Sequence, residues 1–194
     1  MRFWRLAPLA ATAFVFLTAG LSSAGVSTDV TYRLYHFEAG SWVRYTQADP
    51  FPAGGDAPGT NLWKYEYTVK NKTFAGTGIN TWYAFFNSDN VLCAAMSSAA
   101  QPATWTATQQ GPIVPNFNWK ERFRTTTVAS YITTGNSLAG FTVEFTWTCN
   151  SLPGNQNYDA VTSGGSESSV TTEDPETPVP ADSRTWSAIK SMYR

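Results

Sequence analysis

Large and polar side chains alternate in two segments that lie far apart in the chain. From Trp63 to Val69 every second residue is aromatic or aliphatic and its neighbours are polar, and the same pattern returns from Phe141 to Trp147. A period of two places the large side chains on one face of a β-strand. Both segments therefore need a hydrophobic layer to lie against, which indicates a packed, mostly antiparallel β protein.

Further short segments of this kind are separated by stretches rich in Gly, Pro, Asn and Asp, which favour turns. The strands expected are 28–37, 41–47, 62–70, 79–86, 91–96, 104–108, 118–124, 130–134 and 140–150. No segment of the mature chain before residue 183 has a sustained helical period. Many short strands with frequent turns predict an all-β fold, a two-sheet antiparallel β-sandwich.

The first 24 residues have the pattern of a signal peptide, with Arg2 and Arg5 before an apolar run over 6–21 and small residues at 22–24. A membrane anchor is the alternative, but this run is shorter than the roughly 20 residues that a bilayer requires and contains polar breaks. No second segment is apolar enough to span a membrane. We therefore predict a secreted or cell-surface protein.

Charge narrows the classes of partner. The chain has 13 basic and 14 acidic residues and a formal net charge of −1, so it lacks the basic composition that indicates binding to nucleic acid. Only 14% of the residues are charged and 15% are aromatic, a composition common in exported β proteins. Composition alone does not identify a partner.

Cysteine and histidine limit the redox and metal chemistry. Cys93 and Cys149 are the two cysteines of a chain destined for an oxidising compartment, so a disulfide is expected, contributing about 2–4 kcal/mol. The alternative is a pair of buried thiols. His36 is the single histidine and no Cys-x-x-Cys occurs, so we expect neither a metal site nor a cofactor.

Part of the chain resembles the immunoglobulin-like modules of bacterial secreted and cell-surface proteins. The segments that carry the resemblance are Tyr65-x-Tyr67-x-Val69-x-Asn71, Pro102-Ala103-Thr104-Trp105, and Ile132 to Val143 with Gly135, Ser137 and Leu138 at its turn. The resemblance covers about residues 28–150 and implies an immunoglobulin-like sandwich without an active site. The order Cys93, Trp105, Cys149 is similar to that of antibody domains, but the strands expected before Cys93 depart from antibody topology.

The composition changes near residue 160. The tract from 160 to 182 is rich in Ser, Thr and Pro, and its charged residues are all acidic: Glu167, Glu173, Asp174, Glu176 and Asp182. Such a tract buries little apolar surface and its like charges repel, so an extended, disordered linker is expected. The sequence thus predicts a signal peptide over 1–24, a sandwich domain over 25–159, this linker, and a tail over 183–194.

The tail has the pattern of a short amphipathic helix. Trp186, Ile189 and Tyr193 recur at helical spacing, and Lys190 and Arg194 lie near the end, where they suit the helix dipole. The ending resembles short Trp-x-x-Ile-Lys-x-x-Tyr-Arg tails of secreted bacterial proteins, which implies recognition by a sorting or surface-retention factor. Docking of the helix on its own domain, or disorder, are the alternatives.

Candidates for catalysis are few. His36 has no evident nucleophile beside it and is expected to be a structural residue of its strand. Glu66 and Glu144 point away from the aromatic stripes of their strands, and a glycoside hydrolase would require them to converge in a groove. Solvated surface charges are the ordinary explanation, so no catalytic residue is assigned and the chain is predicted not to be an enzyme.

Tryptophans give the remaining hypothesis. Trp42, Trp105 and Trp119 have no clear place in the alternating stripes, and exposed on one face they would stack on sugar rings of a polysaccharide. Core packing is favoured for each, because alternation does not tell which face of a strand is wet. The leading prediction is therefore a non-catalytic structural or adhesive protein, with a carbohydrate-binding module as the alternative and a small sandwich hydrolase as the third.

Overall fold

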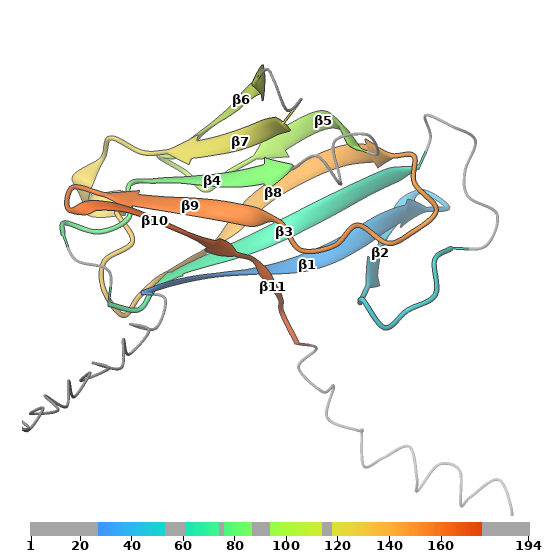
Figure 1. Cartoon of the computed structure of the whole chain (residues 1–194), viewed down its shortest axis with the longest axis horizontal. Helices are drawn as coiled ribbons and strands as arrows, with labels where there is room; N and C mark the ends of the chain where they lie inside the picture. The colour runs from blue at the N-terminus through green and yellow to red at the C-terminus, as the bar shows by residue number, and fades with distance from the viewer. Residues whose placement is uncertain (1–26, 53–60, 74–75, 87–93, 114–117, 176–194) are drawn as a thin grey trace, which may run out of the picture.

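A computed structural model describes residues 27–52, 61–73, 76–86, 94–113 and 118–175 of the chain (Figure 1). The predicted signal peptide, Cys93 and the predicted tail lie outside these residues. Among the residues that the structure describes, no helix is long and apolar enough to cross a membrane.

The first sheet has six strands in the order β11-β1-β3-β8-β5, with β2 also paired to β1. Its members are β1 (Thr28–Glu38), β2 (Ser41–Tyr45), β3 (Leu62–Asn71), β5 (Ala94–Ala100), β8 (Ser137–Trp147) and β11 (Thr172–Glu173). All pairs are antiparallel except β1 with β11, which is parallel. The long central strands β1, β3 and β8 correspond to three of the predicted strands.

The second sheet has five strands in the order β10-β9-β4-β7-β6, and all its pairs are antiparallel. They are β4 (Thr81–Phe86), β6 (Thr106–Ile113), β7 (Asn118–Arg124), β9 (Asn157–Thr162) and β10 (Gly165–Val170). Figure 1 shows the two sheets as stacked layers. The predicted fold class, an all-β two-sheet antiparallel sandwich, is confirmed.

The aromatic stripes fill the space between the sheets, as the alternation predicts. Trp63, Tyr65 and Tyr67 of β3 are buried, and so are the inward residues of β8. Rings stack within each sheet, Tyr65 on Phe145 with centroids 5.1 Å apart and Trp82 on Phe123 at 4.7 Å, and Tyr67 meets Trp82 edge-on across the core at 5.3 Å. Such pairs add about 0.5–1.5 kcal/mol each beyond the burial of their area.

Three core tyrosines of the first sheet end in hydroxyl groups that need partners. They donate to the segment just before β9: Tyr32 to Asn155 Oδ1 at 2.8 Å, Tyr65 to the Gly154 carbonyl at 2.7 Å and Tyr67 to Gln156 Oε1 at 3.2 Å. Burial raises the pKa of Tyr65 and of Tyr67 well above the ordinary value, so both hydroxyls remain donors. The aromatic stripe therefore also anchors the chain entering β9.

The prediction of a linker from residue 160 is wrong for the part of it that the structure describes. Strands β9, β10 and β11 occupy most of 157–173, so the sandwich extends beyond residue 159. Tyr158, Ala160 and Thr162 alternate toward the core and are buried. Only one of these three side chains is large, which is why the stretch reads as too polar to fold. Residues 176–182 lie outside the described chain.

The acidic residues of this stretch have polar partners instead of repelling one another. The contacts are Glu167 Oε1 with the Thr28 backbone N–H at 3.3 Å, Glu173 Oε1 with the Gln47 backbone N–H at 3.1 Å, and Asp174 Oδ2 with Arg33 Nε at 2.7 Å. Each contact joins the stretch 167–174 to β1 or to the residues just after β2. The folded tract is held by hydrogen bonds that composition alone does not predict.

The strand expected over 130–134 is also wrong. Residues Val128–Ser130 form a short 3₁₀ turn, η1, and Ile132 makes only an isolated bridge with Ile79. Gly78 precedes that bridge with φ +112°, and a Cβ there would lie 3.0 Å from the Ile132 carbonyl oxygen. This close approach positions the loop carrying Tyr131 beside the second sheet.

Candidate functional site

Trp105 and Trp119 do not form the tryptophan platform that the carbohydrate-binding alternative requires, and both pack in the core, which is the favoured prediction. Trp105 and Trp119 are only 4% and 6% exposed. Trp119 stacks on Phe86 with centroids 3.8 Å apart, and Trp105 meets the Phe141 ring edge-on at 5.1 Å. Both belong to the core: Trp119 is an inward position of β7, and Trp105 lies just before β6. Of the three candidates, Trp42 alone is partly exposed.

Trp42 lies on the outer face of the first sheet. It is opposite Phe37 in the β1–β2 hairpin, with the two ring centroids 5.2 Å apart. The ammonium group of Lys64 lies 4.5 Å from the Trp42 ring and 4.8 Å from the Tyr35 ring. Lys64 is also directly opposite Glu144 on β8. This face therefore mixes aromatic, basic and acidic groups.

Glu66 and Glu144 do share this face. Glu66 pairs with Thr142 and Glu144 with Lys64, so the two glutamates occupy diagonal positions on adjacent strands, a spacing of about 7–8 Å between residues. Glu144 accepts a hydrogen bond from the Ser98 hydroxyl at 3.0 Å. Burial, followed by the charge of Glu66, raises the pKa of Tyr35. Both carboxylates thus have neighbours on the outer face of a sheet.

His36 lies in the core, as expected for a structural residue. Its ring stacks on Trp63 with centroids 4.5 Å apart, and its Nδ1 is 2.8 Å from Glu38 Oε1. The Tyr45 hydroxyl donates to the same carboxylate at 2.6 Å. This hydrogen bond and the one from His36 hold the pKa of Glu38 below its usual value. The arrangement ties the β1–β2 hairpin together.

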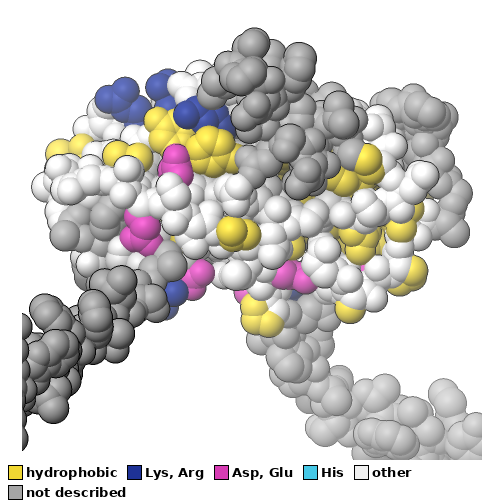
Figure 2. Space-filling view, viewed as in Figure 1, with side chains coloured by type: hydrophobic (Ala, Val, Ile, Leu, Met, Phe, Trp, Pro, Cys, Tyr) yellow, Lys and Arg dark blue, Asp and Glu magenta, His cyan; other side chains and the backbone are white. Residues whose placement is uncertain are grey.

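The outer face of the second sheet carries a row of basic side chains on β7. On β7, Trp119, Glu121 and Phe123 point inward, so the residues between them, Lys120 and Arg122, point outward together with Arg124. Figure 2 shows Lys and Arg side chains gathered beside hydrophobic ones on one part of the displayed surface. The Lys-x-Arg-x-Arg pattern was visible in the sequence but was not singled out.

Aromatic rings hold the first of these cations. The Lys120 ammonium lies 4.3 Å from the ring centroid of Tyr83 and 5.3 Å from that of Phe85, both on neighbouring β4. A ring face attracts a cation without neutralising its charge. None of the three basic residues on β7 makes an ion pair with another described residue. We call Tyr83, Phe85, Lys120, Arg122 and Arg124 the cationic face.

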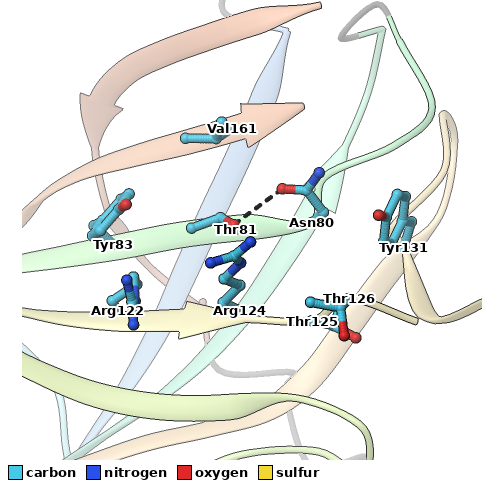
Figure 3. A pocket seen from close by; sticks show the side chains of 9 residues that line it. All are labelled: Asn80, Thr81, Tyr83, Arg122, Arg124, Thr125, Thr126, Tyr131 and Val161. Atoms are coloured by element: carbon cyan, nitrogen blue, oxygen red, sulfur yellow. Dashed lines mark hydrogen bonds between the residues drawn. The ribbon is translucent and has the colours of Figure 1, made fainter. Parts of the chain in front are cut away.

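Two hollows adjoin on this face. The first, of about 340 Å³, lies over Arg122 and Arg124 and is also lined by Tyr83 and Tyr131 (Figure 3). The second, of about 520 Å³, lies over Phe85 and the strands β9 and β10. They meet where Tyr83 pairs with Asp159 of β9. Each is open to solvent rather than closed, and Asp159 lines the second one.

Polar groups surround the basic side chains in the first hollow. In Figure 3, Arg122 and Arg124 rise from β7, while Asn80, Thr126 and Tyr131 lie at the loop end. The Nε of Arg122 has no hydrogen-bond partner within the described chain. Guanidinium, amide and hydroxyl groups in this arrangement can bind an oxygen-rich anion.

One carboxyl group lies beneath the cationic face. Glu121 points inward from β7, is 1% exposed, and its oxygens have no hydrogen-bond partner in the described parts of the chain. Burial raises the pKa of Glu121 to about 7, although the Thr108 backbone and the Arg122 charge favour the ionised form. Near neutral pH this group is thus partly uncharged, so it offsets the charge of Arg122 only in part.

The described residues provide no metal site and one of the two cysteines. Within the described ranges, no group of three or more His, Cys, Asp or Glu side chains is placed to hold a metal ion. Cys149 packs against the core as a partly buried residue. Cys93 lies outside the described residues, so the Cys93–Cys149 disulfide stays a prediction.

Comparisons with known proteins gave likeness in fold only. No protein family matches the chain, and no curated protein matches its sequence. A cohesin module from a Clostridium perfringens family 33 glycoside hydrolase superposes with a TM-score of 0.42 at 8% identity, covering 78% of this chain and 99% of that one. A cohesin–dockerin complex from Clostridium thermocellum gives a TM-score of 0.34 at 10% identity, covering 74% and 94%.

The seventh ScaB type I cohesin of Pseudobacteroides cellulosolvens is similar at a TM-score of 0.32 and 9% identity, covering 61% of this chain and 86% of that one. At such identities and TM-scores the likeness says nothing about what this chain binds. Function has to be argued from its own side chains.

Proposed function

We propose that this protein is a non-catalytic adhesive protein, exported from the cell, that attaches to a surface polymer through its second sheet. The observation that carries the proposal is the cationic face. Three outward basic residues follow one another on β7 without an ion-pair partner among the described residues, and two of them, Arg122 and Arg124, line the first hollow. Exposed charge of this kind supports binding of an extended partner.

The arrangement favours binding over chemistry. The basic residues have aromatic and hydroxyl neighbours, and Asp159, the carboxylate nearest in register, accepts a hydrogen bond from Ser168 at 2.6 Å. Glu66 and Glu144 lie on the opposite sheet, away from these hollows. A glycoside hydrolase needs its two carboxyl groups to flank one sugar linkage. The adhesive role therefore has more support than the hydrolase alternative.

Retention of the mature protein on insoluble material tests this proposal. Residues 25–194 are mixed with cell-wall material and a panel of insoluble polysaccharides, and the bound fraction is compared with that of an unrelated protein of similar charge. We expect retention on at least one polymer, without release of soluble sugars. Absence of retention on every material, or steady release of sugars, would refute an adhesive, non-catalytic role.

The tail over 183–194 has a separate part in the proposal. It lies outside the described residues, and we propose that Trp186, Ile189 and Tyr193 form a recognition surface for a sorting or surface-retention factor, with Lys190 and Arg194 beside them. Deletion of 184–194 is expected to move the protein from the cell surface to the medium in its native host. Unchanged surface retention would eliminate this role and leave the adhesive face unaffected.

A further inference from the structure

We propose that the cationic face binds an acidic polysaccharide, through the carboxylate groups of its uronic acid units. This inference rests on the proposed adhesive function and specifies its ligand. It follows from three properties of the face: the unneutralised charge of its basic row, the geometry of its two arginines, and the polar lining of the hollow above them.

The basic row suits a polymer with repeated negative charges. Residues two apart on a strand are about 6.6–6.8 Å apart, so Lys120, Arg122 and Arg124 form an extended line of cations along β7. A single small anion would engage one or two of them. A chain bearing a carboxylate on successive units can engage the whole line, and the first hollow leaves space beside Arg122 and Arg124.

The two arginines indicate carboxylates as the groups recognised. A guanidinium presents a planar fork of N–H donors that matches both oxygens of a carboxylate. Arg122 is partly exposed and lines the first hollow, and Arg124 is exposed at the end of β7. Lys120, held on its two rings, adds a point charge without directional preference.

The surrounding groups suit sugar hydroxyls. The Asn80 side chain already accepts a hydrogen bond from the Thr81 hydroxyl at 3.0 Å, and its amide N–H₂ group remains available as a donor. Thr126 and Tyr131 supply hydroxyl groups on the same side of the hollow. A hydroxyl both donates and accepts, as does each sugar hydroxyl.

The same observations disfavour a nucleic acid. Proteins that bind single strands offer open aromatic faces on which bases stack. Here the rings of Tyr83 and Phe85 are already engaged by the Lys120 ammonium. Binding of a neutral sugar is also disfavoured, because it requires stacking on open ring faces and those of Tyr83 and Phe85 are engaged by Lys120. The charge on the ligand then supplies most of the affinity.

The outer face of the first sheet provides a built-in comparison. Lys64 also lies over two aromatic rings, those of Tyr35 and Trp42, but Glu144 is directly opposite it and Glu66 is diagonal to Glu144. The charge of Lys64 therefore has a carboxylate directly opposite it, whereas that of Lys120 does not. Changing Lys64 tests whether any lysine on aromatic rings is sufficient for binding.

The test measures binding of residues 25–194 to three soluble probes: polygalacturonate, its highly methyl-esterified form, and a single-stranded DNA. Esterification removes the carboxylate charge and retains the sugar chain. We expect polygalacturonate to bind most tightly and the ester at least about tenfold more weakly, since a hydrogen bond to a charged group contributes a factor of about 10 to 100. Binding should disappear near 1 M salt, where the Debye length is about 3 Å.

Single substitutions locate the site. Arg124→Gln and Arg122→Gln are each expected to weaken binding about 10- to 100-fold, and Arg122→Lys, which keeps the charge but not the fork, less so. Lys70→Gln removes the same charge from an exposed position on β3 and should leave affinity within about twofold. Circular dichroism confirms that each variant is folded, and Arg124 is exposed enough to be changed safely.

Three results would overturn the inference. They are equal affinity for the ester, equal or tighter binding of the DNA, or unchanged affinity in both arginine variants. If polygalacturonate fails to bind while the protein is still retained on another polymer, the acidic-glycan inference is wrong and the adhesive function stands. If nothing is retained anywhere, both are wrong.

Discussion

At the scale of single residues, Glu121 makes the stability of the sandwich depend on pH. Burial raises its pKa to about 7 from an ordinary value of 4.5. Between these values the folded chain keeps a proton that the unfolded chain has released. The contribution of Glu121 to stability is therefore greatest below pH 4.5 and falls as pH rises to about 7. The slope is at most about 1.4 kcal/mol per pH unit.

Urea unfolding of the wild type and of Glu121→Gln checks this prediction at several pH values between about 5 and 8. Glutamine keeps the shape of the side chain and removes its titration. The wild type is expected to lose more stability than the variant over this range. Carboxylates such as Glu38 titrate in both proteins, so the difference between them isolates Glu121. Parallel pH profiles would contradict the assignment.

The turn between β1 and β2 contains a second residue-scale feature. Ala39 has φ 47° and Gly40 φ 84°, so both central residues of this two-residue hairpin are in the left-handed region, as in a type I′ turn. Alanine is strained there and asparagine tolerates it. Ala39→Asn should raise the free energy of unfolding by about 0.5–1 kcal/mol, and Ala39→Val should lower it. The melting temperatures of the two variants and the wild type test this prediction. A stabilising effect of Ala39→Val would exclude a type I′ turn.

At the scale of elements, the last three strands complete both sheets. β9 and β10 form one side of the second sheet, and β11 pairs with the edge of β1. The three tyrosine hydroxyls fix the chain at 154–156 as it enters β9. Removing these strands would expose the edge of β4 and leave the segment 154–156, which holds the partners of those hydroxyls, attached at one end only.

Two truncations test this role. A chain ending at residue 159, the boundary expected from composition, loses half of β9 with all of β10 and β11, whereas one ending at 175 keeps them. We expect the longer chain to unfold cooperatively and the shorter one to show no cooperative transition by circular dichroism. Equal melting temperatures would mean that the last strands are dispensable.

The elements also show how far sequence patterns reach. Strands whose inward residues are large, such as Trp63, Tyr65 and Phe145, were predictable because a period of two admits one interpretation. β9 turns Tyr158 and small neighbours inward, and its tract is folded through hydrogen bonds to residues far away in the chain. The basic row on β7 can be recognised in the sequence. Its lack of an ion-pair partner among the described residues depends on the order of the strands, which one sequence does not give.

At the scale of the whole molecule, the two outer faces differ in charge although the chain is almost neutral. On the first sheet, Lys64 is directly opposite Glu144 and Arg33 forms an ion pair with Asp174. On the second sheet, Lys120, Arg122 and Arg124 follow one another along β7, and the two arginines line the first hollow. Long-range attraction then orients an anionic polymer toward one side of the sandwich. This asymmetry is the basis of the proposed adhesive function.

One comparison tests that claim most directly. Retention on the polymer that binds wild type best is measured for the charge reversals Arg124→Glu, on the second sheet, and Lys64→Glu, on the first. Both change net charge equally. We predict that Arg124→Glu abolishes retention and that Lys64→Glu leaves it nearly intact. Loss of retention in Lys64→Glu alone would place the adhesive surface on the other sheet and contradict the account.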